Sequence, residues 1–190
     1  MPVREAQVMM VKVRKATSDD IPELDRLIPQ SVRILSAGYY TERQIEIALA
    51  HMFGVDTALI EDGTYFIAEL DGQIAGCGGW SRRKTLFGGD QFKGASEDSL
   101  LDPESEPGRI RAFYVHPNRA RRGIGRAIIS ECESAAMHEG FKRLELVATL
   151  PGVPMYEALG YSKIEPFNIP LPDGESLPAV LMGKDLAASS

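Results

Sequence analysis

One segment of the chain constrains its fold more than any other: a strand-like run that leads through a basic, glycine-containing loop into a helix. Residues 109–116 have the pattern of a strand, and Pro117 ends it. The loop that follows lacks large apolar side chains and reaches Gly123-Ile124-Gly125. From there to about residue 139, small and apolar side chains recur on one helical face, namely Ile124, Ile128, Cys132, Ala135 and Ala136. A strand followed by such a helix favours a sheet with helices packed on it.

The beginning of this helix is a candidate anion-binding site. The first turn of a helix presents unpaired N–H groups and the positive end of the helix dipole, and glycine lets a phosphate approach the backbone. A dinucleotide-binding fingerprint is disfavoured because Ile128 stands where Gly or Ala is required, and a P-loop would need Gly-Lys-Ser/Thr. Taken alone, the segment fits a phosphate site and a helix with a solvated basic face equally well. Further positive charge comes from Arg119, Arg121, Arg122 and Arg126.

The first half of the chain predicts a strand, two helices and a hairpin. Residues 11–16 alternate apolar and charged side chains, as a half-buried strand does. Thr17-Ser18-Asp19-Asp20 offers N-caps for a helix through residues 21–28, and a second helix is expected from Thr41 to a stop at Gly54. Residues 64–70 and 73–80 have strand patterns and are joined by the turn Asp71-Gly72.

The second half begins with a long loop, expected over residues 81–108; loops of this length in compact domains are often functional. After the glycine-led helix, residues 144–150 predict a strand and 155–159 a short helix, and residues 161–169 and 178–182 predict two final strands. The order βααββ, then βαβαββ, predicts a mixed α/β or α+β sheet in one domain over residues 11–186. Residues 1–10 and 187–190 are expected to be flexible ends.

Charge and composition exclude several classes of protein. A net charge of -6 argues against a general nucleic-acid or anionic-membrane partner. No apolar run approaches the roughly 20 residues of a membrane span, and the charged N-terminus lacks the apolar core of a signal peptide. Cys77 and Cys132 lie in apolar stretches without metal-ligand spacing, so we expect two buried thiols, no metal site and a cytoplasmic protein.

Two motifs in the second half resemble those of the GNAT superfamily of acyl-CoA-dependent N-acyltransferases. The first is Val115-x-Pro-x-x-x-Arg121-Arg122-Gly123-Ile124-Gly125-Arg126-Ala127, which resembles the family's pyrophosphate-binding motif. The second is Leu144–Leu150 followed by Pro154-Met155-Tyr156-Glu157-Ala158-Leu159-Gly160-Tyr161, and both occur in the family's order and spacing. The resemblance implies a single-domain, mixed and mostly antiparallel sheet flanked by helices. A splayed parallel strand pair, 109–116 and 144–150, would hold the cofactor.

The resemblance also implies acetyl-CoA as cosubstrate and assigns residues to it. Tyr156 occupies the position of the family's proton donor for the departing thiolate. Two departures stand out: Ala120 replaces a frequent Gln or Arg, and Pro151 replaces an Asn that contacts the pantetheine arm. Backbone N–H groups near Tyr114 and Val115 would face the thioester oxygen. The implied cofactor-binding residues are Phe113, Tyr114, Val115, Arg121, Arg122, Gly123, Ile124, Gly125, Arg126, Ala127 and Thr149.

The acceptor side is less defined by the sequence. Several relatives carry a Glu where this chain has Arg109 and Arg111, so no general base can be named. These arginines could bind an anionic group of the acceptor, or could instead pair with acids of the 97–106 loop. His116 is expected to form a structural hydrogen bond. Other candidates at the acceptor mouth are Trp80, the basic run at 81–84, Tyr39, Tyr40 and Tyr65, each of which could equally be packing or surface.

The sequence therefore predicts an N-acetyltransferase in which a small amine attacks acetyl-CoA directly. The partners expected are acetyl-CoA and the amine acceptor, without nucleic acid or membrane, and a homodimer is possible. The alternative is a non-catalytic acyl-CoA-binding sensor of the same fold, which would keep the phosphate loop but has no need for Tyr156.

Overall fold

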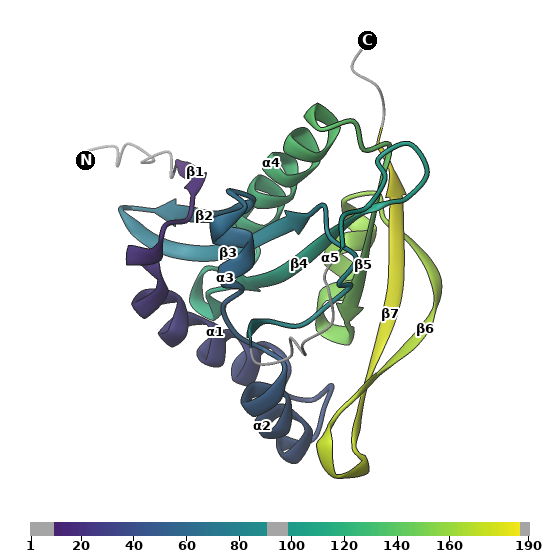
Figure 1. Cartoon of the computed structure of the whole chain (residues 1–190). Coiled ribbons are helices and arrows are strands. Elements are labelled where there is room, and N and C mark those ends of the chain that lie inside the picture. The colour runs from purple at the N-terminus through teal and green to yellow at the C-terminus, as the bar shows by residue number, and fades with distance from the viewer. Residues whose placement is uncertain (1–9, 91–98, 187–190) are drawn as a thin grey trace, which may run out of the picture.

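The computed structural model describes residues 10–90 and 99–186. In these residues seven strands form one sheet in the order β1-β2-β3-β4-β5-β7-β6. Figure 1 shows β1 at one edge of this sheet and the C-terminal hairpin of β6 and β7 at the other. Within the described residues, no helix has both the length and the hydropathy needed to cross a membrane. The expected flexible ends, apart from Met10, lie outside the described residues.

The N-terminal part follows the predicted order. The strand β1 (Val11–Lys15) leads through a capping box of Thr17 and Asp20 into a short 3-10 turn and α1 (Ile21–Leu35). Thr41 and Gln44 form a second capping box at the start of α2 (Glu42–His51). The strands β2 (Tyr65–Leu70) and β3 (Gln73–Ser81) follow as an antiparallel hairpin. Both residues of the Asp71-Gly72 turn have positive φ, as a type I′ turn requires.

The C-terminal part holds the two predicted motifs. The strand β4 (Gly108–Val115) and the helix α4 (Ile124–His138) are joined by the basic loop and a 3-10 turn at Pro117–Arg119. They are followed by β5 (Arg143–Thr149), α5 (Val153–Ala158), β6 (Ser162–Pro170) and β7 (Ser176–Asp185). Because β7 begins two residues before the predicted strand and extends three beyond it, it pairs with β5 along that strand's full length.

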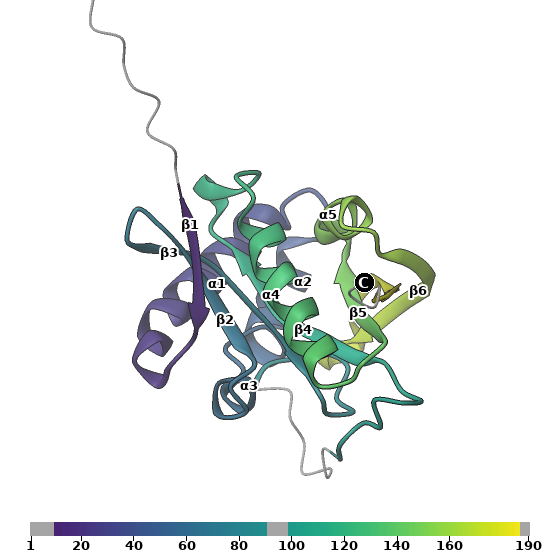
Figure 2. The ribbon, with the colours of Figure 1, turned by 90° about the horizontal axis from the view of Figure 1, so that it is seen from above.

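Helices cover both faces of the sheet and create two hydrophobic cores. One core lies under α4 and α5 and includes Ile124, Ile128 and Tyr156. The other lies under α1, α2 and α3 (Thr57–Glu61) and includes Leu24 and Leu59. Figure 2, seen from above, shows α4 and α1 on opposite sides of the sheet. Cys77 belongs to the second core and Cys132 to the first, so these two buried thiols are free, as expected.

The short helix α3 was not predicted from the sequence. Its N-cap is Asp56, whose carboxylate accepts a hydrogen bond from the Leu59 N–H at 3.4 Å. Five residues are too few for a hydrophobic period to be recognised. The sequence predicted a helix end at Gly54 but not that another helix begins three residues later, at Thr57. The helix α2 also ends three residues earlier than expected, at His51.

The sheet opens between β4 and β5. These parallel strands are paired only at Gly108↔Leu144 and Arg109↔Glu145. Further along, β4 remains paired with β3 and β5 remains paired with β7. The two strands therefore separate toward their C-terminal ends, and the predicted splayed strand pair is confirmed.

Candidate functional site

A cavity of about 670 Å³ passes through the opening between β4 and β5. Its described lining residues come from both sides of the sheet. Ile124, Met155 and Tyr156 belong to the core under α4 and α5, whereas Val32 and Met52 belong to the core under α1 and α2. This volume lies in the range of small-molecule sites, about 300–1,000 Å³. The opening thus connects the start of α4 with the far face of the sheet.

The loop before α4 forms one end of this cavity and has the backbone of an anion site. Arg121 and Gly123 both have positive φ, 62° and 80°. Alternation of left-handed with other conformations turns successive N–H groups toward one point, which is the arrangement called a nest. Gly123 is also the N-cap of α4. Because glycine has no side chain, it cannot cap the N–H groups of the first helical turn. The cavity is lined here by Ala120, Arg121, Gly123, Ile124, Gly125 and Arg126.

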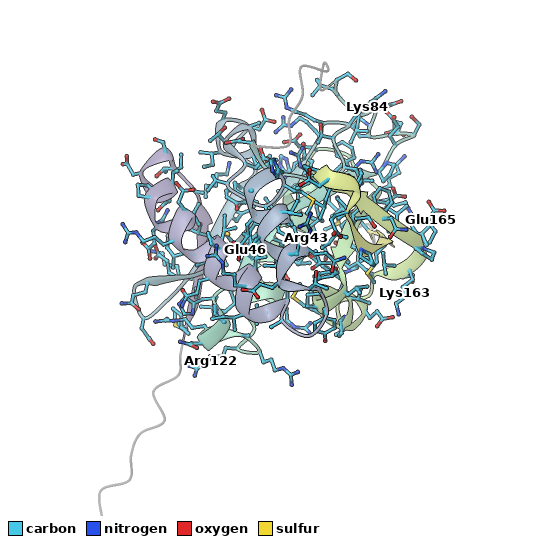
Figure 3. The ribbon with its side chains drawn as sticks, turned by 90° about the horizontal axis from the view of Figure 1, so that it is seen from below. Arg43, Glu46, Lys84, Arg122, Lys163 and Glu165 are labelled. Carbon is cyan, nitrogen blue, oxygen red and sulfur yellow. The ribbon has the colours of Figure 1, made fainter. Side chains whose placement is uncertain are left out.

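Two residues assigned to this loop lie outside the cavity. Arg122 is exposed and lies at the edge of the molecule in Figure 3, where it borders a second, separate pocket with His116. Ala127 does not line the cavity either. Most residues of the predicted loop therefore line the cavity, and Arg121 and Arg126 are the charged residues that this loop contributes to the lining.

Glycines in β3 and α4 allow close packing around the opening. A Cβ at Gly76 would overlap the Ile124 side chain, so this glycine lets α4 lie directly on β3. A Cβ at Gly125 would overlap the sulfur of Met155, which lines the cavity from α5. The missing side chain of Gly125 therefore keeps α4 and α5 close together at the mouth of the cavity.

A β-bulge shapes the wall formed by β4. Ala112 and Phe113 stand opposite the single residue Gly78, and Ala112 has a φ of 52°. A Cβ at Gly78 would overlap the Phe113 ring. The Tyr65 hydroxyl donates a hydrogen bond to the Ala112 carbonyl at 3.0 Å, and this bond stabilises the bulge.

Three residues from the bulge onward were assigned to the cofactor, and all three line the cavity: Phe113, Tyr114 and Val115. The N–H of His116 donates to the Ala75 carbonyl of β3 at 2.8 Å. Because alternate N–H groups of a strand point in opposite directions, the N–H of Val115 points away from β3 and toward the opening. On that side of β4, the described residues of β5 do not pair with Val115.

Tyr156 lies in the cavity wall, on α5. Its side chain is almost fully buried and makes edge-to-face contacts with Phe113 and Tyr161, at centroid distances of 6.1 and 5.8 Å. Its hydroxyl has no hydrogen-bond partner among the described residues. Burial raises the pKa of this phenol, so it keeps its proton at neutral pH. Thr149 and Pro151 also line the cavity, and Pro151 has no side-chain hydrogen-bond donor.

The two arginines of β4 are held by carboxylates. Arg111 is buried and forms an ion pair with Asp56, the N-cap of α3, and it also donates to the Thr85 and Gly88 carbonyls. Arg109 pairs with Glu145 across the last residues of the β4–β5 ladder, at 2.9 Å. Neither partner belongs to the 97–106 loop, so the alternative predicted for these arginines named the wrong acids. Arg111 lines the cavity and Arg109 does not.

Trp80 is placed away from the cavity. Its side chain is fully buried, and its ring packs edge-to-face against Phe141 in the core beneath α4. The expectation that Trp80 lies at an acceptor mouth is therefore wrong in this structure, because the ring points to the other face of β3. The basic run that follows is held in ion pairs: Arg82–Glu139, Arg83–Asp62 and Lys84–Glu106.

The three tyrosines proposed for the acceptor mouth have different surroundings. Tyr39 lines the cavity and is 53% exposed. Tyr40 is buried: its hydroxyl donates to the Pro178 carbonyl at 2.6 Å and accepts from the Leu150 N–H at 2.8 Å. Tyr65 supports the bulge, as described above. The His116 Nδ1 accepts a hydrogen bond from the Asn118 N–H at 3.2 Å, which is the structural role predicted for it.

The lining residues on the far side of the sheet were not identified from the sequence. Val32 and Leu35 belong to the apolar face of α1, where periodicity cannot distinguish a cavity wall from a core. One available signal was the apolar pair Leu86-Phe87 in the loop that follows β3. The remaining members of this side include Ser31, Ser36, Met52, Phe53 and Gly88.

Known proteins share this fold. The GCN5-related N-acetyltransferase structure from Rhodopseudomonas palustris is similar over 96% of this chain and 100% of its own, with 22% identity and a TM-score of 0.67. The PaiA N-acetyltransferase of Thermoplasma acidophilum, solved in complex with coenzyme A, is similar over 93% and 99% of the two chains, with 15% identity and a TM-score of 0.64. YncA from Salmonella typhimurium, solved with its cofactor acetyl-CoA, is similar over 95% and 96%, with 16% identity and a TM-score of 0.61. At these identities the likeness establishes the fold.

The family assignment comes from the sequence match. The profile of the acetyltransferase (GNAT) family matches residues 29–161, which run from α1 through the anion loop to the end of α5 and Tyr161. This range is more than half of the chain and contains the opening in the sheet, the bulge and the nest. The chain belongs to the acetyltransferase (GNAT) family.

Proposed function

We propose that this protein transfers an acetyl group from acetyl-CoA to the amine of a small acceptor by direct attack. The observation that carries the proposal is the cavity through the sheet. It joins a helix N-terminus suited to phosphate with a buried tyrosine and continues to the opposite face. A protein that only bound an anion would need the nest but no passage across the sheet.

The residues present fit coenzyme A. Positive φ at Arg121 and Gly123 supplies the nest, and Arg121 and Arg126 supply charge for the phosphates. The complexes of PaiA with coenzyme A and of YncA with acetyl-CoA show that this fold accommodates the group. Acetyl-CoA would supply a thioester carbonyl that an amine can attack.

This chain's own groups account for two requirements of that chemistry. The N–H of Val115, which points toward the opening, is the candidate donor to the oxygen that becomes negatively charged. Tyr156 is the candidate acid, because its protonated hydroxyl lies in the cavity wall and has no hydrogen-bond partner among the described residues. Among the described lining residues there is no Asp, Glu, His or Lys, so the amine would have to reach the cavity already neutral.

The test is thiol release from acetyl-CoA with and without a panel of primary amines, combined with mass analysis of the acceptor. We expect CoA release that depends on the amine and an acceptor heavier by one acetyl group. Binding of acetyl-CoA in calorimetry without transfer to any amine would contradict the enzyme and favour a sensor.

A further inference from the structure

The cavity wall on the α1–α2 side of the sheet is mainly apolar, with Ser31 and Ser36 as small polar side chains. It is formed by Val32 and Leu35 of α1, by Met52 and Phe53 after α2, and by Leu86 and Phe87 of the following loop. Charged lining residues in the described chain are Arg111, Arg121 and Arg126, and the last two belong to the anion loop at the other end. The α1–α2 end of the cavity therefore contains one charge.

That single charge is already balanced. The side chains of Arg111 and Asp56 are almost completely buried and face one another in an ion pair. The two terminal nitrogens of Arg111 also donate to the Thr85 and Gly88 carbonyls, at 3.4 and 3.3 Å. Its Nε is buried without a partner among the described residues and is not presented to the cavity surface. An acceptor carboxylate would have to displace Asp56, and an acceptor ammonium would find no carboxylate in the described wall.

Aromatic rings dominate the same end. Phe53 packs edge-to-face against Tyr114 at 6.2 Å, and Phe87 packs likewise against Phe167 at 5.5 Å. These contacts hold Phe53, Phe87 and Tyr114 around the cavity, and Tyr39 lies at its exposed rim. Fixed rings present edges and faces to which another aromatic ring can pack.

We propose that the acceptor is a primary amine carried on one aromatic or other apolar group, with no carboxylate and no second ammonium. This inference rests on the proposed acetyl transfer and specifies its substrate class. It replaces the expectation of an anionic acceptor, because the arginines on which that expectation depended are neutralised by Asp56 and Glu145.

Four acceptors separate the possibilities: 2-phenylethylamine, phenylalanine, propylamine and 1,4-diaminobutane. We expect kcat/KM for phenylethylamine to exceed that for phenylalanine and diaminobutane by about a hundredfold, since each of these buries an unbalanced charge. We expect it to exceed that for propylamine by about tenfold, because the ring fills the apolar end. Equal or better turnover of phenylalanine, of diaminobutane or of a charged peptide N-terminus would overturn the proposal.

A matched pair of variants tests the site itself. Phe53→Ala should lower kcat/KM for phenylethylamine about tenfold and change that for propylamine little. Ile60→Ala, in α3, removes a half-buried apolar side chain that packs on the same core but does not line the cavity, and should leave the ratio of the two substrates unchanged. An unchanged ratio in Phe53→Ala would also overturn the proposal.

Binding measurements distinguish failure of this inference from failure of the proposed function. Calorimetry of phenylethylamine on the wild-type protein saturated with CoA should show binding that Phe53→Ala weakens. Transfer to charged amines only would leave the acetyltransferase standing and refute the apolar acceptor. Absence of transfer to every amine, with CoA bound, would refute both.

Discussion

At the scale of single residues, the candidate site depends on side chains that are chemically ordinary but unusually placed. Tyr156 is buried beside the opening in the sheet, and burial alone is the main cause of its raised pKa. Its neighbour Tyr161 is also buried, but the Tyr161 hydroxyl donates to Glu133 at 3.1 Å and does not face the cavity. Two adjacent tyrosines therefore provide an internal comparison between a candidate acid and a structural residue.

Tyr156→Phe removes only a hydroxyl from the cavity wall. We expect single-turnover acetyl transfer to fall by about 10²–10³, because a general acid typically contributes a factor of this order. Acetyl-CoA affinity in calorimetry should remain within about threefold, since the proton is needed only as the thiolate leaves. The control is Tyr161→Phe, which should leave turnover nearly unchanged. Wild-type turnover in Tyr156→Phe would assign this tyrosine to packing.

Arg111→Gln tests whether the buried pair is structural. The substitution removes the cation that the buried Asp56 faces, so we expect a loss in unfolding free energy of about 3 kcal/mol or more. Urea denaturation measures this loss, and the double variant Asp56→Asn with Arg111→Gln should recover part of it. Arg33→Gln, in the exposed pair with Glu46, is the control and should have little effect. A small loss of unfolding free energy in Arg111→Gln would show that the ion pair with Asp56 contributes little to stability.

At the scale of elements, the site is made where three of them are irregular: the start of α4, the bulge in β4 and the parting of β4 from β5. The first N–H groups of α4 receive no cap from Gly123, the bulge interrupts the pairing of β4 with β3, and the described residues of β4 and β5 are not paired beyond Arg109 and Glu145. Small residues permit them, since Gly76, Gly78 and Gly125 leave room for Ile124, Phe113 and Met155. The regular helices and strands form a rigid frame, and the candidate site lies where they are interrupted.

Gly125→Val tests the start of α4. A Cβ there would meet Met155 and narrow the mouth of the cavity, so CoA affinity in calorimetry should fall by tenfold or more. The substitution could act by displacing Met155 or by blocking the ligand itself. Comparing Gly125→Val in a Met155→Ala background separates the two, because the truncated side chain removes the clash inside the protein. Unchanged CoA affinity in both backgrounds would remove the anion-loop assignment.

The sequence predicts helices and strands well, but it predicts poorly where individual side chains are buried and which residues they contact. The order of the predicted helices and strands follows from periodicity and turn residues, which are local signals, whereas the splayed pair was implied by the resemblance of two motifs to those of the GNAT superfamily. The burial of Trp80 and the partners of Arg109 and Arg111 do not follow from such signals, because they depend on which face of β3 or β4 meets which distant residue. Asp56 lies 55 residues from Arg111 along the chain, and no local pattern connects them.

At the scale of the whole molecule, most tyrosines are withdrawn from water. Burial is the main cause that raises the pKa of Tyr40, to about 12, and it likewise raises the pKa values of Tyr65, Tyr114, Tyr156 and Tyr161. An unfolded chain ionises its tyrosines near pH 10. The folded pKa values lie above the unfolded ones, so this contribution to stability is complete below about pH 10 and is lost as pH rises further.

We therefore expect alkaline unfolding to be steep. Above about pH 10, each such tyrosine should lower the unfolding free energy by about 1.4 kcal/mol per pH unit until its folded pKa is reached. Phenolate absorbance during a pH titration should show these five groups ionising together with the loss of structure, and urea midpoints at successive pH values give the slope. Gradual ionisation of all five near pH 10 in protein that stays folded would contradict the burial described here.

The narrow junction between β4 and β5 gives the sheet two leaves, β1 to β4 and β5 to β6, joined by two residue pairs. A ligand that contacts both leaves must be released before they can separate, so its binding increases the free energy needed to separate them. At a hundred times its Kd this amounts to about 2.7 kcal/mol. We expect saturating CoA to raise the melting temperature and to slow amide exchange in β4 and β5 above all. Equal slowing throughout the chain would contradict the two-leaf description. Because proteases cut molecules that have opened, the supply of CoA would then govern how long each copy of the protein survives.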